Sequence, residues 1–233
     1  MVLTYIYRMV LSHTEENYLK CLYHHAIEER NIETDVKHIS TQLGVRPATV
    51  TSMIKKLASK ELVHHTRYGK IQLTETGENL ACAIIRKHRL WEVFLVDILK
   101  FKWDEVHEVA EQLEHVKSQK LIEYLDAFLG YPDFDPHGDP IPNNQGVMPN
   151  LERLSLHHAE LNQRYEVVSV KDAHNELLSY LLEKNIQLKS EITVLRHFQY
   201  DDSVLIQIGI DTEPLLLSGR MASNIMIRLI HEK

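Results

Sequence analysis

Prolines are concentrated in one short segment of this 233-residue chain, and that segment constrains the fold more than any other feature. Five of the seven prolines fall between Gly130 and Asn150, together with Gly138 and Gly146. Proline ends helices and cannot donate a hydrogen bond in a central strand, so the segment predicts a linker or a long irregular connection. It separates about 130 N-terminal residues from about 80 C-terminal residues.

Apolar residues recur at helical spacing before this segment and form short β-rich runs after it. The spacing predicts helices at about 14–26, 36–43, 47–57, 75–94 and 103–129. After the segment, a helix over 175–183 interrupts β-rich runs at 165–170, 191–195, 204–210 and 225–229. Five or so short strands in about 80 residues indicate a small SH3-like barrel.

The order of the first elements is that of a winged helix-turn-helix. The second predicted helix ends at Gly44, where the chain must turn sharply, and the third begins at Pro47. Two short β-like runs then flank Tyr68-Gly69, which predicts a hairpin or wing. This order predicts a DNA-binding module in which the third helix enters the major groove.

Positive charge gathers on the same module. Residues 46–70 hold six Lys or Arg residues against Glu61 alone, although the whole chain has a net charge of −7. Small hydroxyl side chains near the start of the third helix can approach base edges, and basic side chains can contact phosphates. The predicted DNA-contacting residues are Arg46, Thr49, Thr51, Ser52, Lys55, Lys56, Arg67 and Lys70. The alternative is that these residues form the solvent-exposed face of an ordinary three-helix bundle.

Two cysteines, Cys21 and Cys82, are too few for a disulfide framework or a four-cysteine zinc site. We therefore expect a reducing, cytoplasmic location. Apolar runs stay well short of the roughly 20 residues that a membrane helix needs, so no membrane partner is expected.

The middle of the chain is acidic and carries candidate metal ligands. Glu111, Glu114 and His115 are spaced i, i+3, i+4 and share one helical face, with His107 one turn earlier. His88 and Glu92 have the same i, i+4 spacing on the preceding helix. Mixed oxygen and nitrogen ligands suit manganese, iron(II), cobalt or zinc. Each pair alone would usually be a solvated helix face.

Several motifs together resemble the diphtheria toxin repressor family of metal-dependent repressors, and in particular its manganese-responsive branch. They are Arg86-Lys87-His88-Arg89-Leu90-x-Glu92, Val106-His107, Glu111-x-x-Glu114-His115 and Pro136-x-Gly138-x-Pro140-Ile141-Pro142. The resemblance covers about residues 14–142. Residues 154–230 resemble the SH3-like domain of ferrous-iron transport protein A.

The resemblance implies a homodimer with two metal sites in each subunit. By position, the primary site would use Asn17, Glu111, Glu114 and His115. The ancillary site would use His88, Glu92 and His107, with His174 as a further ligand from the SH3-like domain.

Two departures from the family pattern bear on the metal. Iron-responsive relatives have a cysteine where this chain has Glu111, and a carboxylate favours manganese over softer metals. Manganese-responsive relatives have carboxylates where this chain has Asn17 and Lys20, and a charged Lys20 cannot bind a cation. Manganese is therefore favoured, iron(II) remains an alternative, and zinc or cobalt can substitute.

The predicted protein is mainly α with a β-rich C-terminal domain. The predicted domains are a winged helix-turn-helix (1–75), a helical metal-binding and dimerisation domain (76–142), a linker (143–153) and an SH3-like domain (154–233). The predicted function is metal-dependent repression of metal-uptake genes at a double-stranded DNA operator, with no small organic substrate and no enzymatic activity. The alternatives are a winged-helix regulator not controlled by metal and a carboxylate-bridged metalloenzyme.

Overall fold

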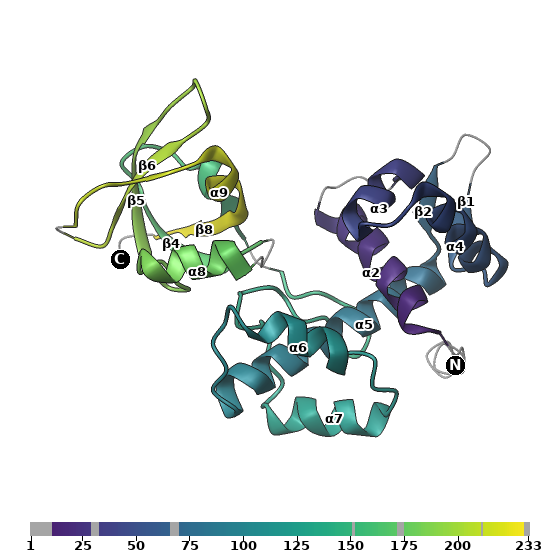
Figure 1. Cartoon of the computed structure of the whole chain (residues 1–233). Helices are drawn as coiled ribbons and strands as arrows, with labels where there is room; N and C mark the ends of the chain where they lie inside the picture. The colour runs from purple at the N-terminus through teal and green to yellow at the C-terminus, as the bar shows by residue number, and fades with distance from the viewer. Residues whose placement is uncertain are drawn as a thin grey trace. The chain divides into compact units, whose positions relative to one another are not determined.

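The computed structural model describes residues 11–28, 33–65, 70–150, 152–171, 175–210 and 212–230. Figure 1 shows the helices and strands with their labels. By its internal contacts the chain divides into two compact units. The first contains residues up to His88 together with Leu113–Ser118 and Pro142–Val147. The second contains Arg89–Gln112, Gln119–Ile141 and the residues from Met148 onward.

The first unit has the winged helix-turn-helix order that the sequence predicts. Its elements are α2 (His13–Glu28), α3 (Val36–Leu43), α4 (Pro47–Ser59), β1 (Val63–His65), β2 (Ile71–Leu73) and most of α5 (Glu75–Val93). Gly44 ends α3 with a φ of 64°, a left-handed conformation that glycine adopts at little cost, and Pro47 occupies the first turn of α4. Strands β1 and β2 pair antiparallel, and the Tyr68-Gly69 turn predicted between them lies outside the described residues.

Helix α2 begins at His13, one residue before its predicted start at Thr14, and is capped by the preceding Ser12. The backbone N–H of Ser12 donates to the Glu15 carboxylate at 2.8 Å, and the backbone N–H of Glu15 donates to the Ser12 hydroxyl at 3.3 Å. This reciprocal pair is a capping box, in which two backbone donors of a helix start are satisfied by side chains. Ser12, and not Thr14, therefore caps the helix.

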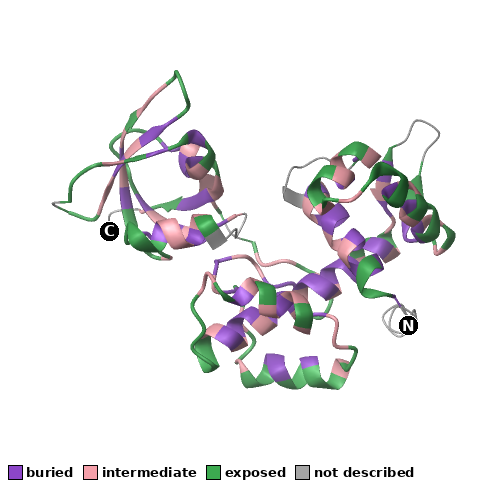
Figure 2. Ribbon diagram, viewed as in Figure 1, coloured by how far each residue is buried: buried purple, intermediate pink, exposed green. Residues whose placement is uncertain are grey.

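The hydrophobic core of the first unit consists of apolar side chains from its helices. Leu19 of α2, Ile39 of α3 and Ile54 of α4 are each 0% exposed, and Leu57 and Leu62 join them (Figure 2). Alternation of buried and exposed residues along α4 leaves its other side free for a partner.

The second unit begins with the end of α5 and a π-helical turn, Phe94–Ile98. Helices α6 (Val106–Leu113) and α7 (Gln119–Phe128) follow, so the single helix predicted over 103–129 is wrong. The chain turns at Glu114 and His115, which belong to the first unit. Their side chains contact Lys20 and Glu16 of α2 in that unit. These tertiary contacts outweigh the local preference for a continuous helix, which residue spacing alone cannot reveal.

The C-terminal part of the second unit is a six-stranded antiparallel sheet within the described residues, in the order β3-β8-β4-β5-β6-β7. Its elements are β3 (Leu154–Ser155), η2 (Leu156–His158), β4 (Arg164–Val170), α8 (Asn175–Glu183), β5 (Glu191–His197), β6 (Val204–Ile208), β7 (Leu215–Leu217), α9 (Gly219–Asn224) and β8 (Ile225–Leu229). Helix α8 contributes Leu178 and Leu181 to a core that includes Val167 and Ile192. The predicted β-rich SH3-like domain is confirmed. Among the described residues, the helices are too short or too polar to cross a membrane.

Candidate metal centres and DNA-binding surface

Glu114 lies just after α6, buried at the centre of a charged cluster in the first unit. Its side chain is 0% exposed, and its two carboxylate oxygens accept hydrogen bonds from Lys20 Nζ of α2 at 2.9 and 2.8 Å. His88 Nδ1 lies 2.6 Å from one of the same oxygens. Burial alone would raise the pKa of Glu114, but the His88 hydrogen bond and the Lys20 charge lower it below its ordinary value. The carboxylate is thus held ionised and in contact with a cation.

His115 is held between two side chains of α2. Its Nδ1 lies 2.5 Å from the Glu16 carboxylate, and its ring stacks on that of His13 with centroids 4.1 Å apart. Its Nε2 faces Glu114, 4.0 Å from the Glu114 Oε1 atom. His115 and Glu114 therefore direct ligand atoms toward a common region.

Asn17 supplies an observation that tests whether a metal fits here. Its side-chain oxygen is buried and has no hydrogen-bond partner among the described residues. An unsatisfied buried acceptor is costly, and a cation would satisfy it. Asn17 follows Glu16 on the first turns of α2, and Lys20 one turn later already places a positive charge on Glu114. The residues present thus fit one divalent cation, in the place where an ammonium group now neutralises the carboxylate.

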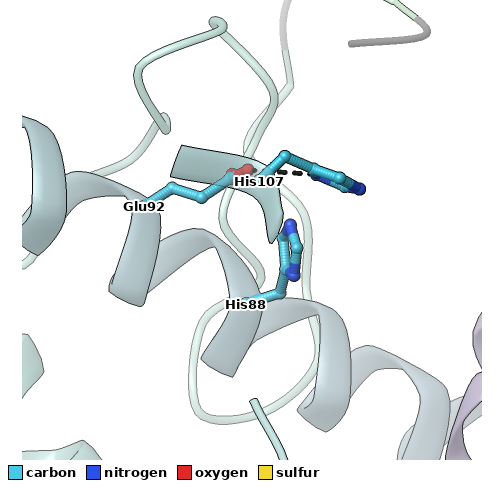
Figure 3. A group of neighbouring side chains, drawn as sticks. All are labelled: His88, Glu92 and His107. Atoms are coloured by element: carbon cyan, nitrogen blue, oxygen red, sulfur yellow. Dashed lines mark hydrogen bonds and ion pairs between the residues drawn. The ribbon is translucent and has the colours of Figure 1, made fainter. Parts of the chain in front are cut away.

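Glu92 of α5 is the centre of a second group of ligands. It is 2% exposed, and its Oε1 atom lies 3.4 Å from His107 Nδ1 of α6. Figure 3 draws His88, Glu92 and His107 as neighbouring side chains, with His88 one turn before Glu92 on α5. His107 Nε2 in turn lies 3.5 Å from the Glu111 carboxylate, so Glu111 contacts this group. His174 lies outside the described residues.

Two candidate ligands near Glu92 were missed by the sequence analysis. Asp135 and His137 belong to the proline-rich segment, are 6% and 2% exposed, and form with Glu92 a group whose ligand atoms lie within 4.8 Å of one another. His137 Nε2 donates to the backbone oxygen of Trp103 at 2.7 Å, which leaves Nδ1 toward Glu92 at 3.8 Å. The signal was the spacing Asp135-x-His137 inside a segment that had been interpreted as a chain break and as a family motif, but not as a source of ligands.

Burial and the neighbouring charges together shift the pKa values of both Asp135 and His137 upward. Burial, with the nearby Glu92 and Asp139 carboxylates, raises the pKa of Asp135. Burial would lower the pKa of His137, but the Glu92 hydrogen bond and the Asp135 charge raise it. Arg89, whose Nε lies 3.6 Å from an Asp135 oxygen, and His137 compensate part of this buried negative charge, and a divalent metal would add further positive charge.

Helix α4 exposes most of the predicted DNA contacts. Thr49, Ser52 and Lys55 are exposed, as is Arg46 at the N-cap position. Thr51 is half-buried, and its hydroxyl donates to the Pro47 backbone oxygen of the same helix at 3.0 Å. Arg67 lies outside the described residues.

Three lysines of this surface already have carboxylate partners. Lys56 Nζ lies 3.3 Å from Glu15, and Lys60 Nζ lies 2.6 Å from the same carboxylate oxygen. Burial would raise the pKa of Glu15, but Lys60, the Ser12 backbone N–H and Lys56 lower it to about 2. Lys70 is exposed, 3.9 Å from the Glu33 carboxylate. Lys55 is therefore better placed than Lys56 to meet a phosphate.

Comparison with protein families and curated proteins identifies relatives of each part of the chain. Residues 10–71 match the N-terminal DNA-binding domain of iron-dependent repressors, and residues 74–143 match their metal-binding and dimerisation domain. Residues 154–229 match the FeoA domain. The iron-dependent repressor IdeR of Mycobacterium bovis is 35% identical over 151 residues, which cover 61% of this chain and 65% of IdeR. The diphtheria toxin repressor of Corynebacterium diphtheriae is 26% identical over 78% of this chain and 84% of its own length. The chain thus spans slightly less than two thirds of the first of these relatives.

Solved structures match over nearly the whole chain. A manganese-dependent transcriptional repressor in complex with manganese is 33% identical, with a TM-score of 0.83 over 93% of this chain and 100% of that one. The repressor ScaR with bound Cd²⁺ is also 33% identical, with a TM-score of 0.81 over 93% of this chain and 99% of ScaR. The winged module, the helical region and the FeoA domain therefore occur in one established order, and the chain belongs to the diphtheria toxin repressor family of metal-dependent transcriptional repressors.

Proposed function

We propose that this protein is a repressor that binds a double-stranded DNA operator as a homodimer when it is loaded with manganese or iron(II). One observation carries the proposal. Helix α2 belongs to the core of the winged module through Leu19 and also contacts Glu114 and His115 through Lys20 and Glu16. Occupancy of a metal site at these residues would therefore act directly on the DNA-binding module.

The proposed primary site consists of Asn17, Glu111, Glu114 and His115. Its ligands are oxygen and nitrogen atoms without a thiolate, a set that favours manganese, with iron(II) as the alternative and zinc or cobalt as substitutes. The ammonium group of Lys20 contacts both oxygens of Glu114 and already supplies one positive charge there, which favours a single ion over a two-ion cluster. The relatives agree with this range, since one solved structure is of a repressor with manganese and the curated relative IdeR is an iron-dependent repressor.

The proposed ancillary site is centred on Glu92. His88 and His107 are its predicted partners, and we add Asp135 and His137, because their buried ligand atoms converge on the same carboxylate. The proline-rich segment thus carries ligands as well as connecting the domains. His174 remains a prediction.

Metal binding and DNA binding would be thermodynamically coupled through residues of this chain. A metal bound at both α2 and the Glu114–His115 turn would favour one position of α2, and with it one position of α4. Because the coupling is reciprocal, operator binding would raise metal affinity by the same factor. Two recognition helices in a dimer would then match half-sites about 34 Å apart.

An exposed apolar surface supports the homodimer. Tyr124 and Phe128 of α7 are 63% and 65% exposed, and Leu121 and Tyr131 are exposed beside them in the same segment. Large apolar side chains gathered on one helix commonly mark a protein interface. The matched metal-binding and dimerisation domain, residues 74–143, includes this helix.

The remaining assignments are also proposals. The domain division 1–75, 76–142, 143–153 and 154–233 is supported by the ranges of the three family matches. A cytoplasmic location is supported by the family and by Cys21 and Cys82, which are not joined in a disulfide. We propose a regulator and not an enzyme, because a carboxylate-bridged enzyme uses inward carboxylates from four helices of a bundle, whereas the groups here lie on α5, α6 and irregular segments.

Replacing His115 with alanine tests the proposed function. We expect H115A to lose the metal-dependent gain in operator affinity, which typical coupling free energies put at about 5- to 150-fold. The measurement is an operator titration with and without Mn²⁺, together with light scattering to check that the variant remains a folded dimer. A variant that responds to Mn²⁺ as the wild type does would rule out the primary site.

Replacing Lys55 with glutamine tests the DNA surface. Loss of one phosphate contact should weaken all DNA sequences similarly and lower the salt slope of log K by about 0.9. K56Q is the matched control, because Lys56 is the next residue on α4 but is paired with Glu15, so its slope should change less. Equal changes in slope for the two variants would contradict this assignment.

A further inference from the structure

Glu16 has no role in the predicted metal sites, yet it makes the closest contact to one of their ligands. It lies on the first turn of α2, and its carboxylate is 2.5 Å from His115 Nδ1. Both side chains are only 9% exposed, so the contact is shielded from water. A charge-assisted hydrogen bond of this kind is short and strong.

The contact determines which nitrogen of His115 is available to a cation. A carboxylate at Nδ1 favours the tautomer in which Nδ1–H donates and Nε2 keeps its lone pair. Nε2 is the atom that faces the Glu114 carboxylate, 4.0 Å from Oε1. His13 stacks on the ring at an interplanar angle of 6°, which limits its tilt. Glu16 and His13 therefore hold His115 in the orientation that a metal bound by Nε2 and Glu114 requires.

Glu16 also changes the charge of the site. Asn17 is neutral, and Lys20 places a positive charge on Glu114. Lys87 also lies close enough for its charge to interact with those of Glu16 and Glu114. These lysines offset the charges of the two ligand carboxylates, Glu111 and Glu114, so a divalent cation would gain from a further negative charge.

We propose that Glu16 is a positioning residue of the primary metal site: it orients His115 through Nδ1 and supplies a negative charge where Asn17 has none. The inference rests on the proposed function, because it concerns the same site. Glu16 acts through His115 and does not itself coordinate the ion, since the Glu16 carboxylate is committed to Nδ1, the ring nitrogen that does not face Glu114.

The test measures Mn²⁺ binding to the full chain by electron paramagnetic resonance of free Mn²⁺, and with Co²⁺ by calorimetry. Removing such a partner typically costs 10- to 100-fold in metal affinity, so E16A should bind Mn²⁺ about 10- to 100-fold more weakly than the wild type. E16Q keeps the size and can still accept from Nδ1–H but lacks the charge, so we expect a smaller loss of about tenfold or less. E78Q, at an exposed position of α5, is the matched control and should leave affinity unchanged.

A second measurement separates orientation from folding. Nitrogen NMR of the metal-free protein should show the proton of His115 on Nδ1 in the wild type and in E16Q, and a mixture of tautomers in E16A. Thermal unfolding without metal identifies any variant that fails to fold. If E16A does not fold, E16Q still tests the proposal. The proposal is overturned if E16A and E16Q, once folded, both bind Mn²⁺ within twofold of E78Q while H115A does not. If H115A also binds normally, the proposed primary site itself is wrong.

Discussion

The E114A variant is expected to be unable to respond to Mn²⁺ and to be less stable than the wild type even without metal. Glu114 is fully buried and contacts both Lys20 and His88, so its removal deletes a ligand and leaves a buried ammonium without its carboxylate. Breaking a buried ion pair from one side costs about 3–5 kcal/mol. Lys20 is 13% exposed and can partly reach water, so we expect about 3 kcal/mol.

Urea unfolding of the metal-free protein measures the stability change, and operator titration with Mn²⁺ measures the response. The double variant K20M/E114L separates the two effects. Replacing both partners with apolar side chains is often neutral, so stability should largely return, while the Mn²⁺ response should stay absent. E105A, at an exposed glutamate, is the control for a simple loss of charge. An E114A protein with wild-type stability would show that Lys20 has another partner, and one with a normal Mn²⁺ response would exclude Glu114 as a ligand.

The second large effect is expected from G138A. Gly138 has a φ of 81°, and a Cβ atom there would lie 1.9 Å from the Val168 backbone oxygen and 2.8 Å from the Ser169 Cα. Both obstacles belong to the backbone of β4, which cannot move aside as a flexible side chain would. Strain in the left-handed region costs about 1–2 kcal/mol, and the clash adds to it, so we expect at least about 3 kcal/mol of destabilisation.

The substitution should also displace Asp135 and His137, which lie in the same turn of the proline-rich segment. We therefore expect loss of one Mn²⁺ per chain with the primary site retained, measured by metal stoichiometry and by urea unfolding. G130A is the matched control, because Gly130 also has a positive φ, 76°, but nothing lies within 4 Å of its added Cβ atom. G130A should be destabilised only by the backbone strain of a positive φ, about 1–2 kcal/mol. Similar losses in the two variants would argue against close packing at Gly138.

Local patterns predicted the elements well wherever burial and local preference agree. Helix α3 ends at Gly44 and α8 spans Asn175–Glu183 as predicted, because capping and apolar spacing are properties of neighbouring residues. The helix predicted over 103–129 failed where the two disagree. Glu114 and His115 leave the helix to contact α2, whose residues precede them by almost a hundred positions.

The candidate metal ligands also divide into those that residue spacing predicted and those that it did not. His107, Glu111, Glu114 and His115 were suggested by spacing on one helix, since side chains three and four residues apart face the same side. Asp135 and His137 were missed, because their proximity to Glu92 depends on the path of a segment with no periodicity. Glu16 was missed because it is adjacent to Asn17 in the sequence. Adjacent residues are about 100° apart around a helix, so spacing did not place Glu16 on the same face as Asn17.

By itself, the sequence determined the order of modules, the positive charge around α4 and the kinds of metal ligand available. These follow from composition and from spacings of a few residues, which act over one or two turns of chain. Only the tertiary structure decided which partner each charged group has. It placed Lys20 on Glu114, Glu16 on His115 and Glu15 on Lys60, and it brought Asp135 and His137 to Glu92. The physical reason is that a buried charge must be compensated by another group, and folding, not sequence proximity, determines which groups are close enough to do so.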